Sequence, residues 1–219
     1  VARDHIERLH NVEYDVFNPI KSPKDRELML SASLISLDVD PHDGEQEAEF
    51  YKFFVENDWK GIMVCDDINM GKGKPGCNNF GMAAFWSDVD KLKYDISDNK
   101  YAHLTGTGII CFDNQEVIIS RNYNKMKIDL REFIIEQTSY NAFGSDIEHY
   151  YAILAHLSTY FNESIIVELG THTGGSAAAL SYNKSNKIYT FDINPTEEAT
   201  ELFKREEYKN ITYIIDNCI

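Results

Sequence analysis

The stretch VELGTHTGGS at residues 167–176 decides the fold, because an apolar run leads directly into a glycine-rich turn and then into small residues. Residues 164–169 predict a strand, and residues 176–182 predict the start of a helix. Gly170 would let the backbone pass close beneath a ligand, and amides at a helix start can receive a carboxylate or a hydroxyl. The spacing is E-x-G-x-x-x-G, which differs from the G-x-G-x-x-G that cradles a pyrophosphate and argues against a dinucleotide.

A second element of this half is Asp192, which follows a predicted strand at residues 187–191. It comes about twenty residues after the turn, where a carboxylate can take both hydroxyls of a ribose. A third predicted strand at residues 210–215 completes a β-α-β-α-β unit. This pattern is typical of half of a nucleotide-binding fold.

The first part of the chain repeats the alternation of strand-like and helix-like segments. The predicted strands are residues 34–38 and 61–65, and the predicted helices are residues 45–57, 82–89 and 146–161. Residues 105–119 predict an antiparallel hairpin with its turn at Asp113 and Asn114, at one edge of the sheet. The whole pattern predicts an α/β fold, with a mostly parallel sheet and helices on both faces.

Three carboxylates come at the ends of the two upstream strands. Asp38 ends one strand, and Asp66 with Asp67 ends the other. Strand ends of this kind converge over the ligand crevice of an open α/β sheet. Because converging carboxylates repel unless a cation neutralises them, we predict a metal site for Mg²⁺, with Mn²⁺ or Ca²⁺ as alternatives. The alternative is that these acids only cap helices or lie in loops.

The segments VELGTHTGGSA and YTFDINP resemble class I S-adenosylmethionine-dependent methyltransferases, and within them the catechol O-methyltransferase-like and macrocin O-methyltransferase-like groups. The segments LISLDVDPHDG and GIMVCDDIN resemble the fourth and fifth strands of those groups. The resemblance covers nearly the whole chain. It implies one domain over residues 1–219 with a Rossmann-like, doubly wound, seven-stranded sheet, in which residues 1–120 form the metal and substrate half and residues 121–219 the cofactor half.

The resemblance also implies site residues. Those implied to contact S-adenosylmethionine are Glu168, Gly170, His172, Gly174 and Ser176 around its methionine part and ribose, Asp192 at the ribose, and Asp216 near the adenine. Two of them have structural alternatives, since His172 can be a turn histidine and Ser176 a helix cap. The implied metal ligands are Asp38, Asp66 and Asp67.

The catalytic base is the least settled role. The catechol enzymes use a lysine, and Pro41 occupies the corresponding place in this chain. His42 is the natural replacement, because a histidine titrates near neutrality and can accept the proton of an acceptor hydroxyl. His42 as a plain loop residue stays open, and so do Asp40 and Asp43 as alternative metal ligands.

In the resembled families the cofactor half precedes the metal half, whereas here it follows. We therefore expect a circularly permuted strand order, which joining Ile219 to Val1 would restore. Residues 11–20 and 210–219 match at four of ten positions. Duplication with loss of the outer copies and a re-cut between the third and fourth strands both stay open as origins.

Charge and composition bear on partners. The formal net charge of −15 makes nucleic acid an improbable substrate, and no apolar run is long enough to span a membrane. The four scattered cysteines are typical of reduced thiols in a cytoplasmic protein. A homo-oligomer or excision from a larger chain is possible. Residues 85–108 are similar to methyltransferase domains attached to glycan-building enzymes of large DNA viruses, which implies a sugar hydroxyl as acceptor; otherwise a small molecule is expected.

Two rival functions remain. Asp38, Val39 and Asp40 match the D-x-D motif of a glycosyltransferase that holds manganese and a nucleotide diphosphate. That rival leaves the glycine-rich turn and Asp192 unexplained. The other rival is a module that binds the cofactor without catalysis.

Overall fold

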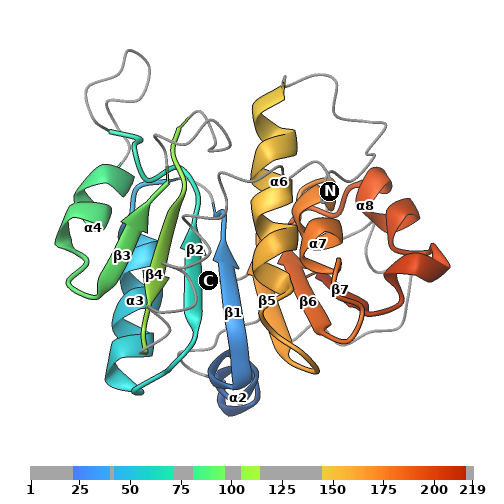
Figure 1. Cartoon of the computed structure of the whole chain (residues 1–219), viewed down its shortest axis with the longest axis horizontal. Coiled ribbons are helices and arrows are strands. Elements are labelled where there is room, and N and C mark those ends of the chain that lie inside the picture. The colour runs from blue at the N-terminus through green and yellow to red at the C-terminus, as the bar shows by residue number, and fades with distance from the viewer. Residues whose placement is uncertain (1–21, 40–41, 72–80, 97–104, 114–144, 216–219) are drawn as a thin grey trace.

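One seven-stranded sheet organises the computed structural model, which describes residues 22–39, 42–71, 81–96, 105–113 and 145–215 (Figure 1). The order across the sheet is β3-β4-β2-β1-β5-β6-β7. The strands are β1 (Ala32–Leu37), β2 (Ile62–Cys65), β3 (Leu92–Asp95), β4 (Gly108–Cys111), β5 (Ile165–Leu169), β6 (Lys187–Asp192) and β7 (Ile211–Ile215). The five strands from β2 to β7 across the sheet pair in parallel, whereas β4 is antiparallel to both β2 and β3. The predicted α/β class with an antiparallel edge is confirmed at this level.

The antiparallel edge is built differently from the prediction. β4 forms as expected, but its neighbours are β2 on one side and β3 on the other. The predicted partner, residues 115–119, lies outside the described residues. The hairpin prediction is therefore wrong about the partner of β4, because β3 precedes β4 in the chain and occupies the outer edge.

Helices cover both faces of the sheet. They are α2 (Pro23–Ser31), α3 (Glu45–Glu56), α4 (Met82–Asp88), α6 (Ser145–Ser158), α7 (Gly175–Leu180) and α8 (Glu197–Leu202), with a 3₁₀ helix η2 (Glu206–Tyr208). Because successive strand residues point to opposite faces, β1 contributes to two separate cores. Ile35 packs in the core that contains Phe54 of α3, and Leu34 packs in the core that contains Ile153 of α6. Burial on both faces explains the continuous apolar runs that predicted these strands.

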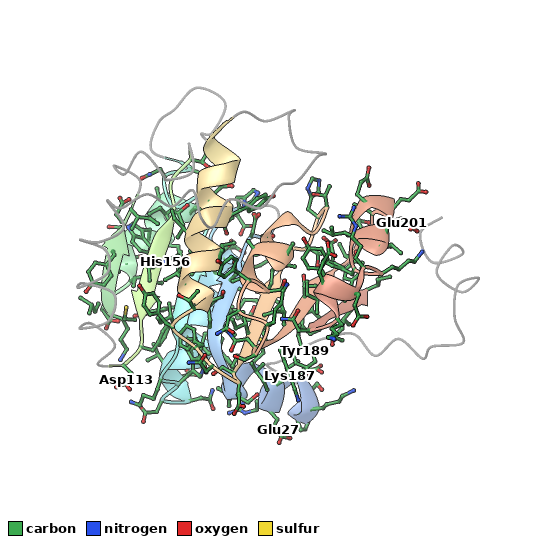
Figure 2. All side chains as sticks on the ribbon, turned by 45° about the vertical axis from the view of Figure 1, so that its right-hand side comes forward. Glu27, Asp113, His156, Lys187, Tyr189 and Glu201 are labelled. Atoms are coloured by element: carbon green, nitrogen blue, oxygen red, sulfur yellow. The ribbon has the colours of Figure 1, made fainter. Side chains whose placement is uncertain are left out.

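The chain direction across the sheet reverses between β1 and β5. From β5 the chain proceeds outward through β6 to β7, whereas from β1 it proceeds in the opposite direction to β2. In Figure 2, Lys187 marks the amino end of β6, and Glu201 lies on α8, beyond the carboxyl end of that strand. Because β1 and β5 are parallel neighbours, both end on the same side of the sheet, and the chain continues from them in opposite directions. Open α/β sheets bind their ligands at the carboxyl ends of the strands at such a reversal.

No helix in the described ranges is long and apolar enough to cross a membrane.

Candidate functional site

The reversal point brings the two predicted half-sites together. The backbone N–H of Asp38 donates to the carbonyl oxygen of Leu169 at 3.0 Å, so the end of β1 is joined to the end of β5. A side chain at Gly170 would place its Cβ 1.9 Å from the carbonyl oxygen of Asp38. Gly170 also has a φ of 97°, a conformation that favours glycine. The sequence predicted that Gly170 makes room for a ligand. In the structure, Gly170 is required because the backbone of Asp38, just after β1, passes too close for a side chain.

Asp192 fastens the two loops of the cofactor half to each other. Its Oδ2 accepts a hydrogen bond from the backbone N–H of His172 at 2.6 Å, and its Oδ1 accepts one from the N–H of Asn194 at 2.7 Å. The hydroxyl of Thr196 donates to the carbonyl oxygen of His172 at 2.9 Å. A carboxylate offers about four acceptor positions, so these two bonds leave capacity for the hydroxyls of a ribose. The predicted ribose ligand therefore also has a structural role.

Glu168 is the buried acid of the cofactor half, with 1% of its surface exposed. Its Oε2 accepts from the Thr190 hydroxyl at 2.5 Å, while its Oε1 is buried with no hydrogen-bond partner. Burial raises the pKa of Glu168 to about 8, although Ser176 and Thr190 act to lower it. A buried carboxyl group with one unpaired oxygen is costly unless a ligand completes it, which fits a cationic or hydrogen-bonding group of a cofactor.

The remaining predicted cofactor residues surround the turn. His172 is exposed with a φ of 47°, and Gly174 precedes α7 with a φ of 89°. A Cβ at Gly174 would come 2.7 Å from the ring of Phe203, so this glycine is also needed for packing. Ser176 is half-buried in the first turn of α7. Asp216 lies outside the described residues.

Among the described residues of the metal half, Asp38, His42 and Asp67 form a cluster of possible ligands. One ligand atom from each of the three lies within 4.8 Å of the other two. His42 Nδ1 is 3.5 Å from Asp67 Oδ2, and Asp67 Oδ1 accepts a hydrogen bond from the Thr105 hydroxyl. Two carboxylates and one imidazole suit a divalent cation, and the imidazole favours Mn²⁺ over Mg²⁺ because magnesium prefers oxygen ligands.

Asp66 lies apart from this cluster. It is buried, with 6% of its surface exposed, and its Oδ1 accepts from the Thr107 hydroxyl at 3.4 Å. Asp67 has a φ of 59°, so the backbone turns sharply between the two acids. Of the three predicted ligands, the structure gathers Asp38 and Asp67, and His42 takes the third place.

The loop that carries His42 is held at several points. His42 has a φ of 60°, and its carbonyl oxygen accepts from the N–H of Gly81 at 3.2 Å. Asp43, an alternative ligand in the sequence analysis, instead accepts the N–H of Glu45 at the start of α3 at 2.9 Å. The other alternative ligand, Asp40, lies outside the described residues, as does Pro41.

Sequence reasoning missed Glu47, which is buried in the first turn of α3. A glutamate near a helix start is usually an exposed capping residue, so its type gave no signal. The position of Glu47 did give a signal, because Glu47, Phe50 and Phe54 have the spacing of residues on one face of a helix. Phe50 and Phe54 are buried, and Glu47 is buried with them.

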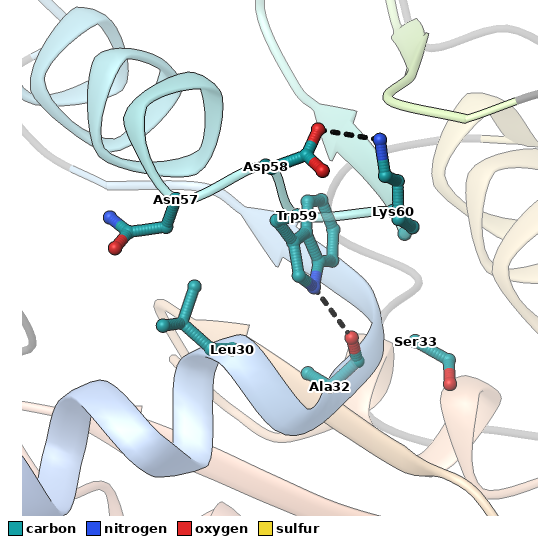
Figure 3. A pocket seen from close by; sticks show the side chains of 8 residues that line it. Leu30, Ala32, Ser33, Asn57, Asp58, Trp59 and Lys60 are labelled. Carbon is teal, nitrogen blue, oxygen red and sulfur yellow. Dashed lines mark hydrogen bonds and ion pairs between the residues drawn. The ribbon is translucent and has the colours of Figure 1, made fainter.

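A pocket of about 300 Å³ lies at the opposite end of the sheet, between α2 and the segment that precedes β2 (Figure 3). In this pocket Asp58 pairs with Lys60 at 2.5 Å, and the Trp59 indole N–H donates to the carbonyl oxygen of Ala32 at 2.8 Å. The predicted site residues lie at the carboxyl ends of the strands, which remain the candidate site.

Comparisons with known proteins do not assign a family. No protein-family model, no curated protein and no solved structure matches the chain.

Proposed function

We propose that the chain is an S-adenosylmethionine-dependent O-methyltransferase assisted by a divalent cation. Its acceptor is a hydroxyl group of a small molecule or a glycan. The observation that carries this proposal is the meeting of two chemically different half-sites at the β1–β5 boundary. One half offers a buried acid and a carboxylate at a strand end, and the other offers the Asp38, His42 and Asp67 cluster.

We also propose that the fold is a doubly wound sheet in circularly permuted order. Numbered from β5, the strands β7, β6, β5, β1 and β2 read 3-2-1-4-5 across the sheet. This is the order at the start of the Rossmann sheet, in which ligands bind at the reversal between strands 1 and 4. In this chain the strands numbered 4 and 5 come first, which is what a permutation would produce.

The residues present fit both absent groups. When bound, S-adenosylmethionine supplies a methyl group on a sulfonium, and a divalent cation lowers the pKa of an acceptor hydroxyl and fixes its position. Glu168 has an unpaired oxygen for a polar group of the cofactor, and Asp192 keeps acceptor capacity for a ribose. Asp38, His42 and Asp67 supply the donors for the cation.

His42 has two roles to fill, proton acceptor and cation ligand. His42 Nδ1 lies 3.5 Å from Asp67 Oδ2. A ring nitrogen with a free lone pair can take the acceptor proton or bind the cation, but not both at once. Placement of the nucleophile against the methyl group would supply much of the remaining rate enhancement.

Calorimetry with S-adenosylmethionine tests the proposal, in Mn²⁺ and in EDTA. We expect cofactor binding in both conditions, since the cation is proposed to hold the acceptor. A folded protein that binds a nucleotide sugar and not S-adenosylmethionine would overturn the proposal in favour of glycosyl transfer.

A further inference from the structure

Glu47 is a buried acid that the proposed reaction does not yet use. Its side chain lies on the buried face of α3 with Phe50 and Phe54, and only 2% of the residue is exposed. Its Oε2 is buried with no hydrogen-bond partner. Leaving a buried carboxyl oxygen unpaired costs free energy, and each such group in a native protein calls for a specific explanation.

The surroundings of Glu47 connect it to the cation cluster. Phe50 and Phe54, on the same face of α3, pack in the core that also contains Val39, just after β1, and Cys65, at the end of β2. The charges of His42, Asp43 and Asp38 act on the carboxyl group of Glu47, and Glu47 in turn acts on the thiol of Cys65. Glu47 therefore lies near the carboxyl ends of β1 and β2, on the α3 side of the cluster.

The helix geometry fixes this placement. Gly44 precedes α3 with a φ of 81°, and a Cβ there would come 2.8 Å from the carbonyl oxygen of Gly81. This contact holds the start of α3 against the segment before α4. The N–H of Gly81 also donates to the carbonyl oxygen of His42 at 3.2 Å, so His42 and the start of α3, where Glu47 lies, contact the same residue.

We propose that Glu47 is the third carboxylate of the cation site formed by Asp38, His42 and Asp67. Its unpaired oxygen accepts a hydrogen bond from a water molecule bound to the cation. The inference rests on the cation site of the proposed function and adds to it a residue that sets affinity. The number of carboxylates around a divalent cation is a main determinant of affinity, and outer ligands of this kind support it through hydrogen bonds.

The test is direct titration with Mn²⁺ alone, measured by the loss of the electron paramagnetic resonance signal of the free ion. The variants are Glu47→Gln, which keeps the shape and removes the charge, and Glu49→Gln as the matched control. Glu49 lies on the same helix, and the same charge is removed from an exposed position. We expect Glu47→Gln to weaken Mn²⁺ binding by about tenfold or more, and Glu49→Gln to match the wild type.

Thermal unfolding without metal separates this role from a structural one. Glutamine is neutral, so Glu47→Gln should unfold at the wild-type temperature or above it. Should the variant unfold early, Glu47→Asp, which keeps the charge, decides the matter. Recovery of Mn²⁺ affinity by the aspartate supports the proposal, and equal loss in both variants overturns it.

The outcomes also distinguish this inference from the proposed function. If Asp67→Asn loses Mn²⁺ and Glu47→Gln binds it as the wild type does, the role of Glu47 is overturned and the cation site stands. If the wild type does not bind Mn²⁺, the cation site itself fails, and the inference fails with it.

Discussion

The two halves of the candidate site are held together in different ways. In the cofactor half, the carboxylate that we propose for the ribose is already bound by backbone, since Asp192 accepts hydrogen bonds from the N–H groups of His172 and Asn194. In the metal half, carboxylates converge, with ligand atoms of Asp38, His42 and Asp67 within 4.8 Å of one another. Asp38 and Asp67 approach each other around His42, and Glu47 has a buried oxygen without a partner.

This difference indicates which half depends more on a bound ligand for its stability. Hydrogen bonds within the protein fix the loops around Asp192, so their shape does not depend on a bound cofactor. Converging carboxylates repel one another, and a bound cation would remove that repulsion. We therefore expect metal removal to have larger effects than changes in the cofactor half, and the predictions below test that ranking.

Removal of the cation should have the largest effect. EDTA is expected to abolish methyl transfer and to leave the affinity for S-adenosylmethionine nearly unchanged, as measured by calorimetry. Asp67→Asn should weaken Mn²⁺ binding by about a hundredfold or more, since a direct ligand contributes at least as much as an outer one.

Asp66→Asn is the matched comparison for Asp67→Asn. The sequence predicts that Asp66 is a metal ligand. In the structure, Asp66 is not part of the cluster and accepts a hydrogen bond from Thr107. The Asp66 variant should therefore lose less Mn²⁺ affinity than the Asp67 variant. Full activity in EDTA, or equal losses in the two variants, would contradict this picture of the metal half.

Replacement of His42 should come next in size. If His42 is the base, His42→Ala lowers the maximal rate by about 10² to 10⁴. Mn²⁺ affinity then changes little. A large loss of Mn²⁺ affinity in the same variant would instead assign His42 to the cation, and parallel rate and binding measurements decide between the two.

Asp192→Ala should have a smaller effect, confined to the cofactor half. Binding of S-adenosylmethionine is expected to weaken by about 2 kcal/mol, the contribution of hydrogen bonds to a charged group. Because Asp192 also fastens two loops, Thr196→Ala is the control, since it loosens the same loops and keeps the carboxylate. Equal losses in both variants would reduce Asp192 to a loop residue.

Much of the fold follows from the sequence, and the reason is burial. The strands β1, β2, β5 and β6 have their apolar residues on both faces, so they stand out as continuous runs. β3 (Leu92–Asp95) was missed because it is a short edge strand without buried residues. Its structure depends on pairing with β4, and local sequence does not report a distant partner.

The site was predicted less completely than the fold. The sequence places Asp66 and Asp67 together at a strand end, but it cannot separate them, because the left-handed backbone at Asp67 sends the two side chains to different neighbours. Glu47 was missed for a related reason. Its residue type is typical of a solvated helix start, and only its burial on one face of α3 connects it to the site.

The last predicted effect is that of Glu168 on stability as a function of pH, which does not involve a ligand. Burial raises its pKa from 4.5 to about 8, so between these values the folded protein holds a proton that the unfolded chain has released. The free energy of unfolding should therefore fall as the pH rises through this window, by about 1.4 kcal/mol per pH unit at most. Glu168→Gln should remove the contribution of Glu168 to this slope and leave that of Glu47, whose pKa burial raises to about 7; denaturant unfolding at pH 5 and pH 8 measures it, with Glu49→Gln as the exposed control. An unchanged slope in Glu168→Gln would mean that Glu168 is ionised in the folded protein. The cofactor half would then contain buried negative charge, as the metal half does.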